Sequence, residues 1–391
     1  MSGTIESKIC EARFRARMLY NELDKVKTEI KDSTLEQCGT NIGSIRGGCD
    51  LKVYRNLKGH ENKICKFVWN SNSTSILSCS QDGYMIIWDA VTGFKKNLIA
   101  LDNPWVLTCG FSPDDKLIAC GGLDNCCTIY RLNDFETQEI DCKNNGNEIS
   151  MFGINNHSLL SIFKGHTAYI SDCKFLNNTK LITSSGDMTC CLWDITKGAR
   201  ISSFNDHLGD VMTIDLMDNH HLFISGSSDG YVNLWDIRKS QPVQNIFITN
   251  NDVTTIRGFN NGQSFISGSD DGILRLIDLR SDCELNSYNL FNDTNFLRSN
   301  NYSSLTNYRN SIISTNSYDI PSVMSIDISK SYRLIYGCYS DYGCVIWDSI
   351  KNEIVGNLGT NMGKTNQVSV SYDGLAVATA NWDSNIRIWS I

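Results

Sequence analysis

The chain has 391 residues, of which 41% are hydrophobic and 20% are charged. Its formal net charge of -8 argues against a nucleic-acid backbone as the main partner, because binding to a polyanion requires clustered positive charge. The sequence has no N-terminal apolar signal segment and no apolar run long enough to cross a bilayer, so we expect a cytoplasmic protein. The 16 cysteines form no CxxC pair, which favours reduced, buried thiols.

Residues 1–32 carry the pattern of an amphipathic helix. Apolar residues recur at alternating spacings of four and three, and no proline interrupts them. The positions of this heptad seam are Ile5, Ile9, Ala12, Ala16, Leu19, Leu23, Val26 and Ile30. Such a seam is typical of a coiled coil. It could pack on the rest of this chain or on another chain, and we favour another chain because the helix has nothing in its own extension to pack against.

The next segment leads from this helix into a first strand. Residues 33–50 are polar and rich in glycine, which is typical of a linker. Residues 51–57 alternate like a strand but have no partner strand before them. In a ring closed by its two ends, this strand would complete the last repeat beside Trp389.

The remainder of the chain is a repeat in which an Asp lies six residues before a bulky residue that ends a predicted strand. The seven pairs are Asp82–Trp88, Asp124–Tyr130, Asp187–Trp193, Asp229–Trp235, Asp271–Ile277, Asp341–Trp347 and Asp383–Trp389. A period of about 40–45 residues that closes on Trp-Asp is typical of a four-stranded propeller blade, and seven such blades can close into a ring.

We therefore predict an all-β fold, a seven-bladed WD-repeat β-propeller over residues 51–391, with an N-terminal coiled-coil α-helix. Two insertions interrupt the period, at about 133–160 and 285–320. Both are rich in asparagine and serine and have little apolar periodicity, so we expect surface loops there.

A His, a Ser or Thr, an Asp and a Trp recur together in three repeats. One such set would suggest a hydrolase triad. A triad has no reason to repeat, however, whereas a hydrogen-bond chain that ties the turns of each blade together does. The three sets are His60, Ser78, Asp82 and Trp88; His166, Thr183, Asp187 and Trp193; and His207, Ser225, Asp229 and Trp235.

Other candidate catalytic and metal-binding motifs lack the residue spacing that their chemistry requires. The glycines of residues 359–365 are too close together for a phosphate-binding loop. His220 and His221 have no Cys, Asp or Glu at metal-ligand spacing. We therefore predict a protein without catalytic residues, metal site or cofactor, and thus no enzyme.

Several strings resemble the β subunits of heterotrimeric G proteins. They include SQDGYMIIWD (80–89), WVLTCGFSP (105–113), ACGGLDN (119–125) and TSSGDMTCCLWDI (183–195). The resemblance covers the N-terminal seam and all seven repeats, but not the two insertions. It implies a signal-transducing subunit that pairs obligately with a γ subunit through the seam and binds an α subunit in its GDP form. Once freed, such a subunit binds downstream effectors through an overlapping surface.

The resemblance also implies a location and a set of binding residues. The protein would be peripheral on the inner face of the plasma membrane through its γ subunit, and would meet the receptor only indirectly. Two residues, Ile86 and Lys95, would meet the N-terminal helix of the α subunit at the side of the first blade. The other implied α-subunit and effector contacts are Lys63, Trp105, Leu107, Leu123, Asn125, Thr167, Tyr169, Asp210, Met212, Asp252, Asp270 and Trp382.

The types of these residues also indicate an interaction surface without reference to the family. Trp, Tyr, Leu and Met surrounded by Asp and Lys form the mixture expected of an interaction surface. The chain departs from the family pattern at Cys65, Tyr84 and Ser340, which bears on the choice of α subunit and not on the fold. The alternative function is that of a generic WD-repeat scaffold for kinase-pathway or ubiquitin-ligase assembly.

Overall fold

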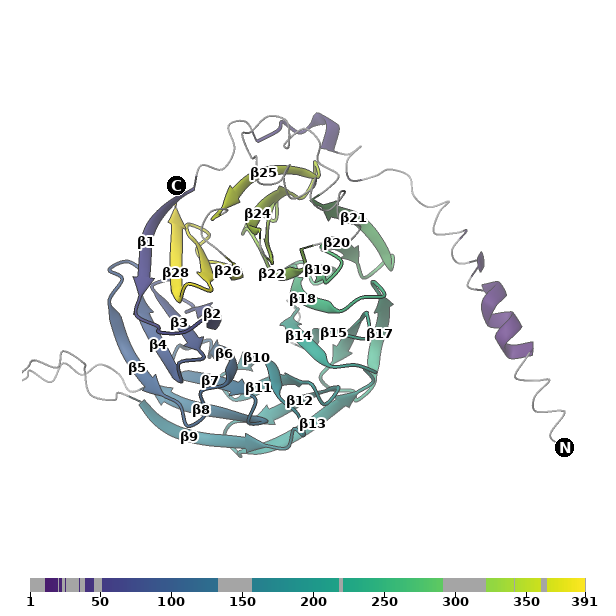
Figure 1. The fold of residues 1–391 in the computed structure, drawn as a ribbon. Helices are drawn as coiled ribbons and strands as arrows, with labels where there is room; N and C mark the ends of the chain where they lie inside the picture. Colours follow the sequence, from purple (N-terminus) through teal and green to yellow (C-terminus); the bar gives the residue numbers. More distant parts are fainter. Residues whose placement is uncertain are drawn as a thin grey trace, which may run out of the picture.

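The computed structural model describes most of the chain. The described residues are 11–19, 21–22, 25, 35, 39–45, 51–132, 157–217, 221–290, 321–340, 342–359 and 364–390. Within these ranges the chain folds into seven four-stranded antiparallel sheets that are arranged as blades around a central channel (Figure 1). The seven-bladed propeller predicted from the repeat is confirmed.

Each blade begins with the strand that lines the channel and ends with the strand on the perimeter. Blade 1 contains β2 (Ile64–Trp69), β3 (Ser75–Ser80), β4 (Tyr84–Asp89) and β5 (Lys95–Ala100); blade 2 contains β6 (Val106–Phe111), β7 (Leu117–Gly122), β8 (Cys126–Leu132) and β9 (His157–Lys164). Blade 3 contains β10 (Ile170–Asn177), β11 (Lys180–Ser185), β12 (Thr189–Asp194) and β13 (Ala199–Asn205); blade 4 contains β14 (Val211–Leu216), β15 (Leu222–Ser227), β16 (Tyr231–Asp236) and β17 (Pro242–Phe247). Blade 5 contains β18 (Val253–Gly258), β19 (Ser264–Ser269), β20 (Ile273–Asp278) and β21 (Cys283–Asn289); blade 6 contains β22 (Val323–Ile328), β23 (Leu334–Tyr339), β24 (Gly343–Asp348) and β25 (Glu353–Leu358). Blade 7 contains β26 (Thr365–Val370), β27 (Val377–Asn381), β28 (Asn385–Ser390) and, on the perimeter, β1 (Lys52–Lys58).

The two ends of the propeller sequence close the ring. Strand β1 pairs antiparallel with β28, so that Val53 lies opposite Trp389 in the ladder. The first strand thus completes the last blade, as the unpaired alternating segment 51–57 predicts. Closure in this way leaves only short perimeter edges exposed.

The hydrophobic core lies between neighbouring blades and not at the centre of the ring. One core cluster, for example, joins Leu57 of β1, Trp88 of β4 and Ile386 of β28. Trp88, Trp235 and Trp347 are among the largest fully buried side chains. Burial of one large apolar side chain contributes roughly 1.5–3 kcal/mol, so the interfaces between blades supply most of the stability. The cysteines in the described part of the chain are free thiols, most of them buried.

The structure shortens both insertions. Residues 157–160 belong to β9 and pair with β8, and residues 285–289 belong to β21 and pair with β20. Leu290 is 3% exposed and packs in the core beside blade 6. Neither strand alternates cleanly, because a β-bulge at Leu160 or Leu285 interrupts the period of two. The loops expected at 133–156 and 291–320 lie outside the described residues, as does Asp341 of the sixth repeat.

The segment predicted to be a linker is partly docked on blade 6. It contains a short 3-10 helix, η1 (Gly39–Asn41), in which Gly39 is buried against Ile350. Arg333 donates a hydrogen bond to the Gly43 carbonyl at 2.7 Å, and Leu35 packs against the adjacent core. The sequence pattern missed this docking because the contacts come from single residues without a period.

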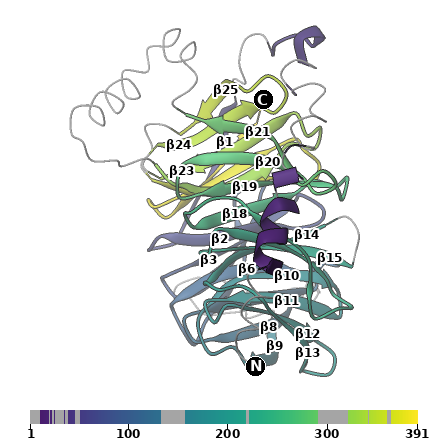
Figure 2. The same cartoon turned by 90° about the vertical axis from the view of Figure 1, so that its right-hand side faces the viewer.

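The described part of the N-terminal segment is helical at residues 11–19, 21, 22 and 25. This helix lies outside the ring in Figure 1 and in front of the blades in Figure 2, and its Phe14, Met18 and Leu19 are 65%, 50% and 64% exposed. The seam residues Ala12 and Ala16 are exposed as well, whereas the remaining seam positions lie outside the described residues. No helix in the described ranges is long and apolar enough to cross a membrane.

Candidate protein-interaction surface

The His, Ser or Thr, Asp and Trp side chains of each repeated set form a hydrogen-bonded network. In blade 4, His207 Nδ1 lies 3.0 Å from Asp229 and Nε2 lies 2.7 Å from Ser225, to which the Trp235 indole donates at 2.7 Å. The same contacts recur in blade 1 (His60, Ser78, Asp82 and Trp88) and in blade 3 (His166, Thr183, Asp187 and Trp193). The histidines are buried, so these sets join the turns of a blade and offer no catalytic triad to a substrate.

One backbone hydrogen bond recurs in every blade and defines a ring of positions at one mouth of the channel. The N–H of the residue before the repeat Asp donates to the carbonyl of the residue before the channel strand, as from Leu123 to Trp105 at 3.0 Å. We call the residues at these positions the rim. In blade order the rim pairs are Lys63 and Gln81, Trp105 and Leu123, Tyr169 and Gly186, Asp210 and Ser228, Asp252 and Asp270, Ser322 and Ser340, and Lys364 and Trp382.

Most of the implied binding residues gather on this rim. Trp105, Leu123 and Trp382 are about half exposed, at 53%, 50% and 48%. The other rim members of the implied set are Lys63, Tyr169, Asp210, Asp252 and Asp270. The structure thus brings together on one surface residues that come from six of the seven blades.

The other implied contacts of the channel mouth lie beside the rim. Leu107 and Met212 each occupy a β-bulge that recurs at the second residue of every channel strand, and both line the channel. A bulge re-aims the side chain of its extra residue, which explains why these apolar side chains are not in the core. Asn125 donates a hydrogen bond to the Thr167 carbonyl at 3.2 Å and so joins the turns of blades 2 and 3.

The two residues implied at the side of blade 1 differ in burial, since Lys95 is partly exposed and Ile86 is buried. Lys95 lies on the perimeter strand β5, where its ammonium donates to the Gly59 carbonyl at 3.0 Å and lies 5.5 Å from the centroid of the Trp88 ring. Ile86 is only 1% exposed and packs in the core between blades 7 and 1. The expectation that Ile86 contacts a partner is therefore wrong for this conformation, because the neighbouring blade covers that face of β4.

The rim and the bulge positions beside it also contain residues that the sequence did not predict as contacts. Lys364 is the rim partner of Trp382, and Met324, which is 37% exposed, occupies the bulge position of blade 6. The signal for Lys364 was present in the sequence. It precedes Trp382 by eighteen residues, which is also the interval from Trp105 to Leu123.

Charge is distributed unevenly around the rim. At blades 7 and 1, the ammonium groups of Lys63 and Lys364 lie 4.9 and 5.1 Å from the centroid of the Trp382 ring. At blades 4 and 5, burial and then the neighbouring carboxylates Asp270 and Asp210 raise the pKa of Asp252 above its ordinary value. The rim thus has a cationic-aromatic sector and an acidic sector. A partner with complementary charges would bind in one orientation.

The apolar and hydrogen-bonded parts of the rim lie between these two sectors. Trp105 and Leu123 form the apolar part on blade 2, and Tyr169 of blade 3 donates from its hydroxyl to Asp210 at 2.9 Å. Burial, followed by this carboxylate, raises the pKa of Tyr169 to about 12, so the hydroxyl stays a donor at neutral pH.

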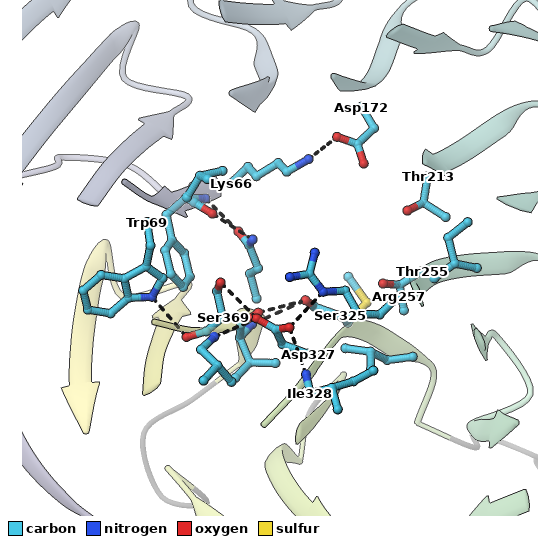
Figure 3. A pocket seen from close by; sticks show the side chains of 18 of the residues that line it. Lys66, Trp69, Asp172, Thr213, Thr255, Arg257, Ser325, Asp327, Ile328 and Ser369 are labelled. Atoms are coloured by element: carbon cyan, nitrogen blue, oxygen red, sulfur yellow. Dashed lines mark hydrogen bonds and ion pairs between the residues drawn. The ribbon is translucent and has the colours of Figure 1, made fainter. Parts of the chain in front are cut away.

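The channel itself is a cavity of about 360 Å³, and several of the charged side chains that line it form ion pairs (Figure 3). Arg257 contacts Asp327 at 3.0 Å and Asp215 at 3.3 Å, and Lys66 pairs with Asp172. Asp215 and Asp327 also accept hydrogen bonds from the backbone of the next blade, at Gly258 and Val370.

These channel contacts have a structural role. Burial raises the pKa of Asp215, but the Arg257 and Lys174 charges outweigh it and hold this pKa below its ordinary value, so the carboxylate is ionised. Each carboxylate joins neighbouring blades. Among the described residues, no group of three or more His, Cys, Asp or Glu side chains is arranged to hold a metal ion.

The fold defines the chain as a WD-repeat propeller, with exposed aromatic and charged residues on its rim. Residues 6–308 match the family described as "G protein beta WD-40 repeat protein", and residues 356–390 match "WD domain, G-beta repeat". The chain therefore belongs to the family of G protein β subunits. The resemblance seen in the sequence is confirmed.

Two curated relatives cover nearly the whole chain. The chain is 40% identical over 402 aligned positions to the "Guanine nucleotide-binding protein subunit beta" of Saccharomyces cerevisiae (strain ATCC 204508 / S288c), with 99% of this chain and 91% of that protein covered. It is 42% identical over 391 positions to the protein of the same name from Dictyostelium discoideum, with 100% of both chains covered.

Proposed function

We propose that this G protein β subunit holds a γ subunit through its N-terminal seam and binds a GDP-loaded α subunit on the rim. After nucleotide exchange releases the α subunit, downstream effectors bind the same rim. The observation that carries the proposal is the composition of the rim, in which exposed Trp105 and Leu123 lie between a cationic sector around Trp382 and an acidic sector. Binding energy concentrates in such aromatic anchors.

The proposed γ subunit accounts for the exposed apolar helix. Of the described seam residues, Leu19 is 64% exposed, and Ala12 and Ala16 are exposed as well. Burial of a seam leucine or isoleucine against a second helix contributes roughly 1.5–3 kcal/mol, and the sequence of the seam has several such residues, so the pairing is proposed to be obligate. Attachment to the inner face of the plasma membrane is then proposed to be peripheral and to occur through γ. The receptor is reached through the assembled heterotrimer.

The experiment compares Trp105→Ala with a matched control, Tyr372→Ala. Tyr372 is 59% exposed and follows the channel strand β26, so it lies at the mouth opposite the rim. The affinity of each βγ dimer is measured for an α subunit with GDP and with a GTP analogue. Trp105→Ala should weaken binding of the GDP form by roughly thirtyfold, because loss of an aromatic anchor costs on the order of 2 kcal/mol. Tyr372→Ala should bind as the wild type does.

Two results would contradict the proposal. Equal affinity of the wild type for both nucleotide states would remove the GDP dependence. Unchanged binding by Trp105→Ala would remove the rim as the site. Either result would favour the generic WD-repeat scaffold for kinase-pathway or ubiquitin-ligase assembly.

A further inference from the structure

Blade 4 carries an exposed apolar patch outside the rim. Leu208, Tyr231 and Phe247 are 85%, 39% and 54% exposed. Tyr231 and Phe247 lie opposite each other in the β16–β17 ladder, and their rings meet edge to face with centroids 5.3 Å apart. We call these three residues the blade-4 stripe.

The residues at the corresponding positions of the other blades show whether the fold requires an apolar stripe. At the position of Leu208, blades 1, 2, 3 and 5 have the polar residues Glu61, Asn103, Thr167 and Asn250, whereas the sequence has Ile320 and Met362 at this position of blades 6 and 7. At the positions of Tyr231 and Phe247 the cross-strand pairs are Tyr84–Ala100, Cys126–Lys164, Thr189–Asn205, Ile273–Asn289 and Asn385–Lys58. Blades 1 and 3 keep the backbone hydrogen bond that Leu208 makes, with a polar residue in its place. The stripe is therefore not needed to build a blade.

The stripe is continuous with the rim. Both oxygens of the Asp229 carboxylate accept backbone hydrogen bonds from stripe residues, one from Leu208 and one from Tyr231, each at 2.9 Å. Leu208 precedes the rim residue Asp210 by two positions, and Met212 follows two positions later at the channel. Blade 4 thus presents one radial path from its perimeter at Phe247 to the channel mouth.

The charges beside the stripe are acidic. Asp206 is exposed and accepts a hydrogen bond from Asn245 at 2.8 Å, and Asp210 lies on the other side of Leu208 in the chain. An aromatic pair rimmed by carboxylates matches a partner segment whose apolar side chains are flanked by Lys or Arg. An exposed cross-strand aromatic pair adds at most about 1 kcal/mol to a sheet, and the other blades form without one, so we attribute a binding role to this pair.

We propose that the blade-4 stripe extends the α-subunit site outward from the rim and takes an apolar segment of the GDP-loaded α subunit that is flanked by basic residues. The inference rests on the proposed function, because the α subunit is the partner that the rim would hold. The stripe then adds affinity for α subunits with such a segment and discriminates against those without it.

The test uses the complete βγ dimer and a GDP-loaded α subunit. Phe247→Ser and Leu208→Ser are compared with Val243→Ser, which changes a residue of the same strand as Phe247 with the same 54% exposure but near the opposite end. Each stripe variant should weaken α binding about tenfold, and Val243→Ser should leave it unchanged. Melting temperature and γ binding should stay at wild-type values for all three, since the changed side chains are exposed.

Trp105→Ala, measured in parallel, separates this inference from the proposed function. If Trp105→Ala weakens α binding and both stripe variants bind as the wild type does, the stripe is not part of the site and the inference fails alone. If neither Trp105→Ala nor the stripe variants weaken binding, the proposed function fails as well. If only the stripe variants weaken binding, the rim is not the α site and the inference that the stripe extends a site on the rim fails with the proposed function.

Discussion

The ammonium group of Lys63 lies 4.9 Å from the centroid of the Trp382 ring, which joins the first and last blades across the point where the propeller closes. Trp382 keeps 48% of its surface exposed, so a partner can still stack on it. A cation near the face of a Trp is worth about 0.5–2 kcal/mol, depending on its desolvation. The pair thus fixes the orientation of an aromatic anchor and places positive charge beside it.

Replacement of Lys63 by Met should weaken the α subunit about tenfold and reduce the salt dependence of binding. Lys63→Met keeps the aliphatic stem but removes the charge that orients Trp382 and attracts an acidic partner group. Lys63→Arg should retain most of the affinity, because a guanidinium also packs on an aromatic face. Affinities at low and high ionic strength measure both effects. Wild-type affinity of Lys63→Met at low salt would exclude a role for the charge.

Replacement of the seam residues Leu19 and Leu23 by Glu should abolish pairing with γ. Leu19 is 64% exposed in this chain alone, and two carboxylates in a coiled-coil seam cannot be buried without a large desolvation cost. Arg15→Ala is the control, because Arg15 lies off the seam and pairs with Glu11 at 2.9 Å. Co-expression with γ, followed by size-exclusion chromatography with light scattering, measures the pairing. A wild-type chain that is stable and soluble as a monomer would contradict the coiled coil.

Replacement of Thr183 by Val should destabilise the propeller by on the order of 3 kcal/mol. The two side chains have nearly the same shape, but Val removes the hydroxyl that accepts from the Trp193 indole at 2.8 Å and contacts His166 at 2.8 Å. Each buried polar group left without a partner costs roughly 1–3 kcal/mol. Thr183→Ser should cost much less, since blades 1 and 4 use Ser at this position. Urea unfolding measures the difference, and equal stability of both variants would refute the network.

The stability contributed by His166 should fall as the pH rises from about 6.5 to about 9. Burial lowers the pKa of this imidazole, but the hydrogen bond to Asp187 outweighs it and raises the pKa to about 9 from the ordinary 6.5. A raised pKa means that the folded state binds the proton more tightly, so the contribution is complete below pH 6.5 and disappears above pH 9. The same pair holds the pKa of Asp187 well below its usual range, so the carboxylate stays charged throughout this window.

The control for this pH effect is Asp187→Asn, which removes the carboxylate that raises the His166 pKa. Melting temperatures of both proteins are compared between pH 6 and 9. The difference between wild type and variant should shrink as the pH rises, because the ion pair exists only while His166 is protonated. A difference that stays constant across this range would show that His166 is neutral in the folded protein.

Much of the fold could be read from the sequence because each blade is built from contacts that are local in the chain. The Asp229–Gly230 turn and Trp235 lie within one repeat, and their hydrogen bonds to His207 and Ser225 span 22 and 10 residues. The repeat therefore marks every blade, even where Tyr130 or Ile277 replaces the Trp. The docking of Gly39 on Ile350 left no such trace, because it depends on a single contact between distant segments.

The candidate site also depends partly on patterns local in the sequence and partly on the tertiary structure. The sequence by itself determined the seven-bladed repeat, the heptad seam and a set of candidate binding residues. Only the tertiary structure decided which of these residues share a surface, because Lys63 and Trp382 meet through closure of the ring. It also decided that Ile86 is buried while Phe247 is exposed. A blade is covered on both faces by its neighbours and open at its ends, so the alternation of a strand cannot tell a core residue from a contact residue.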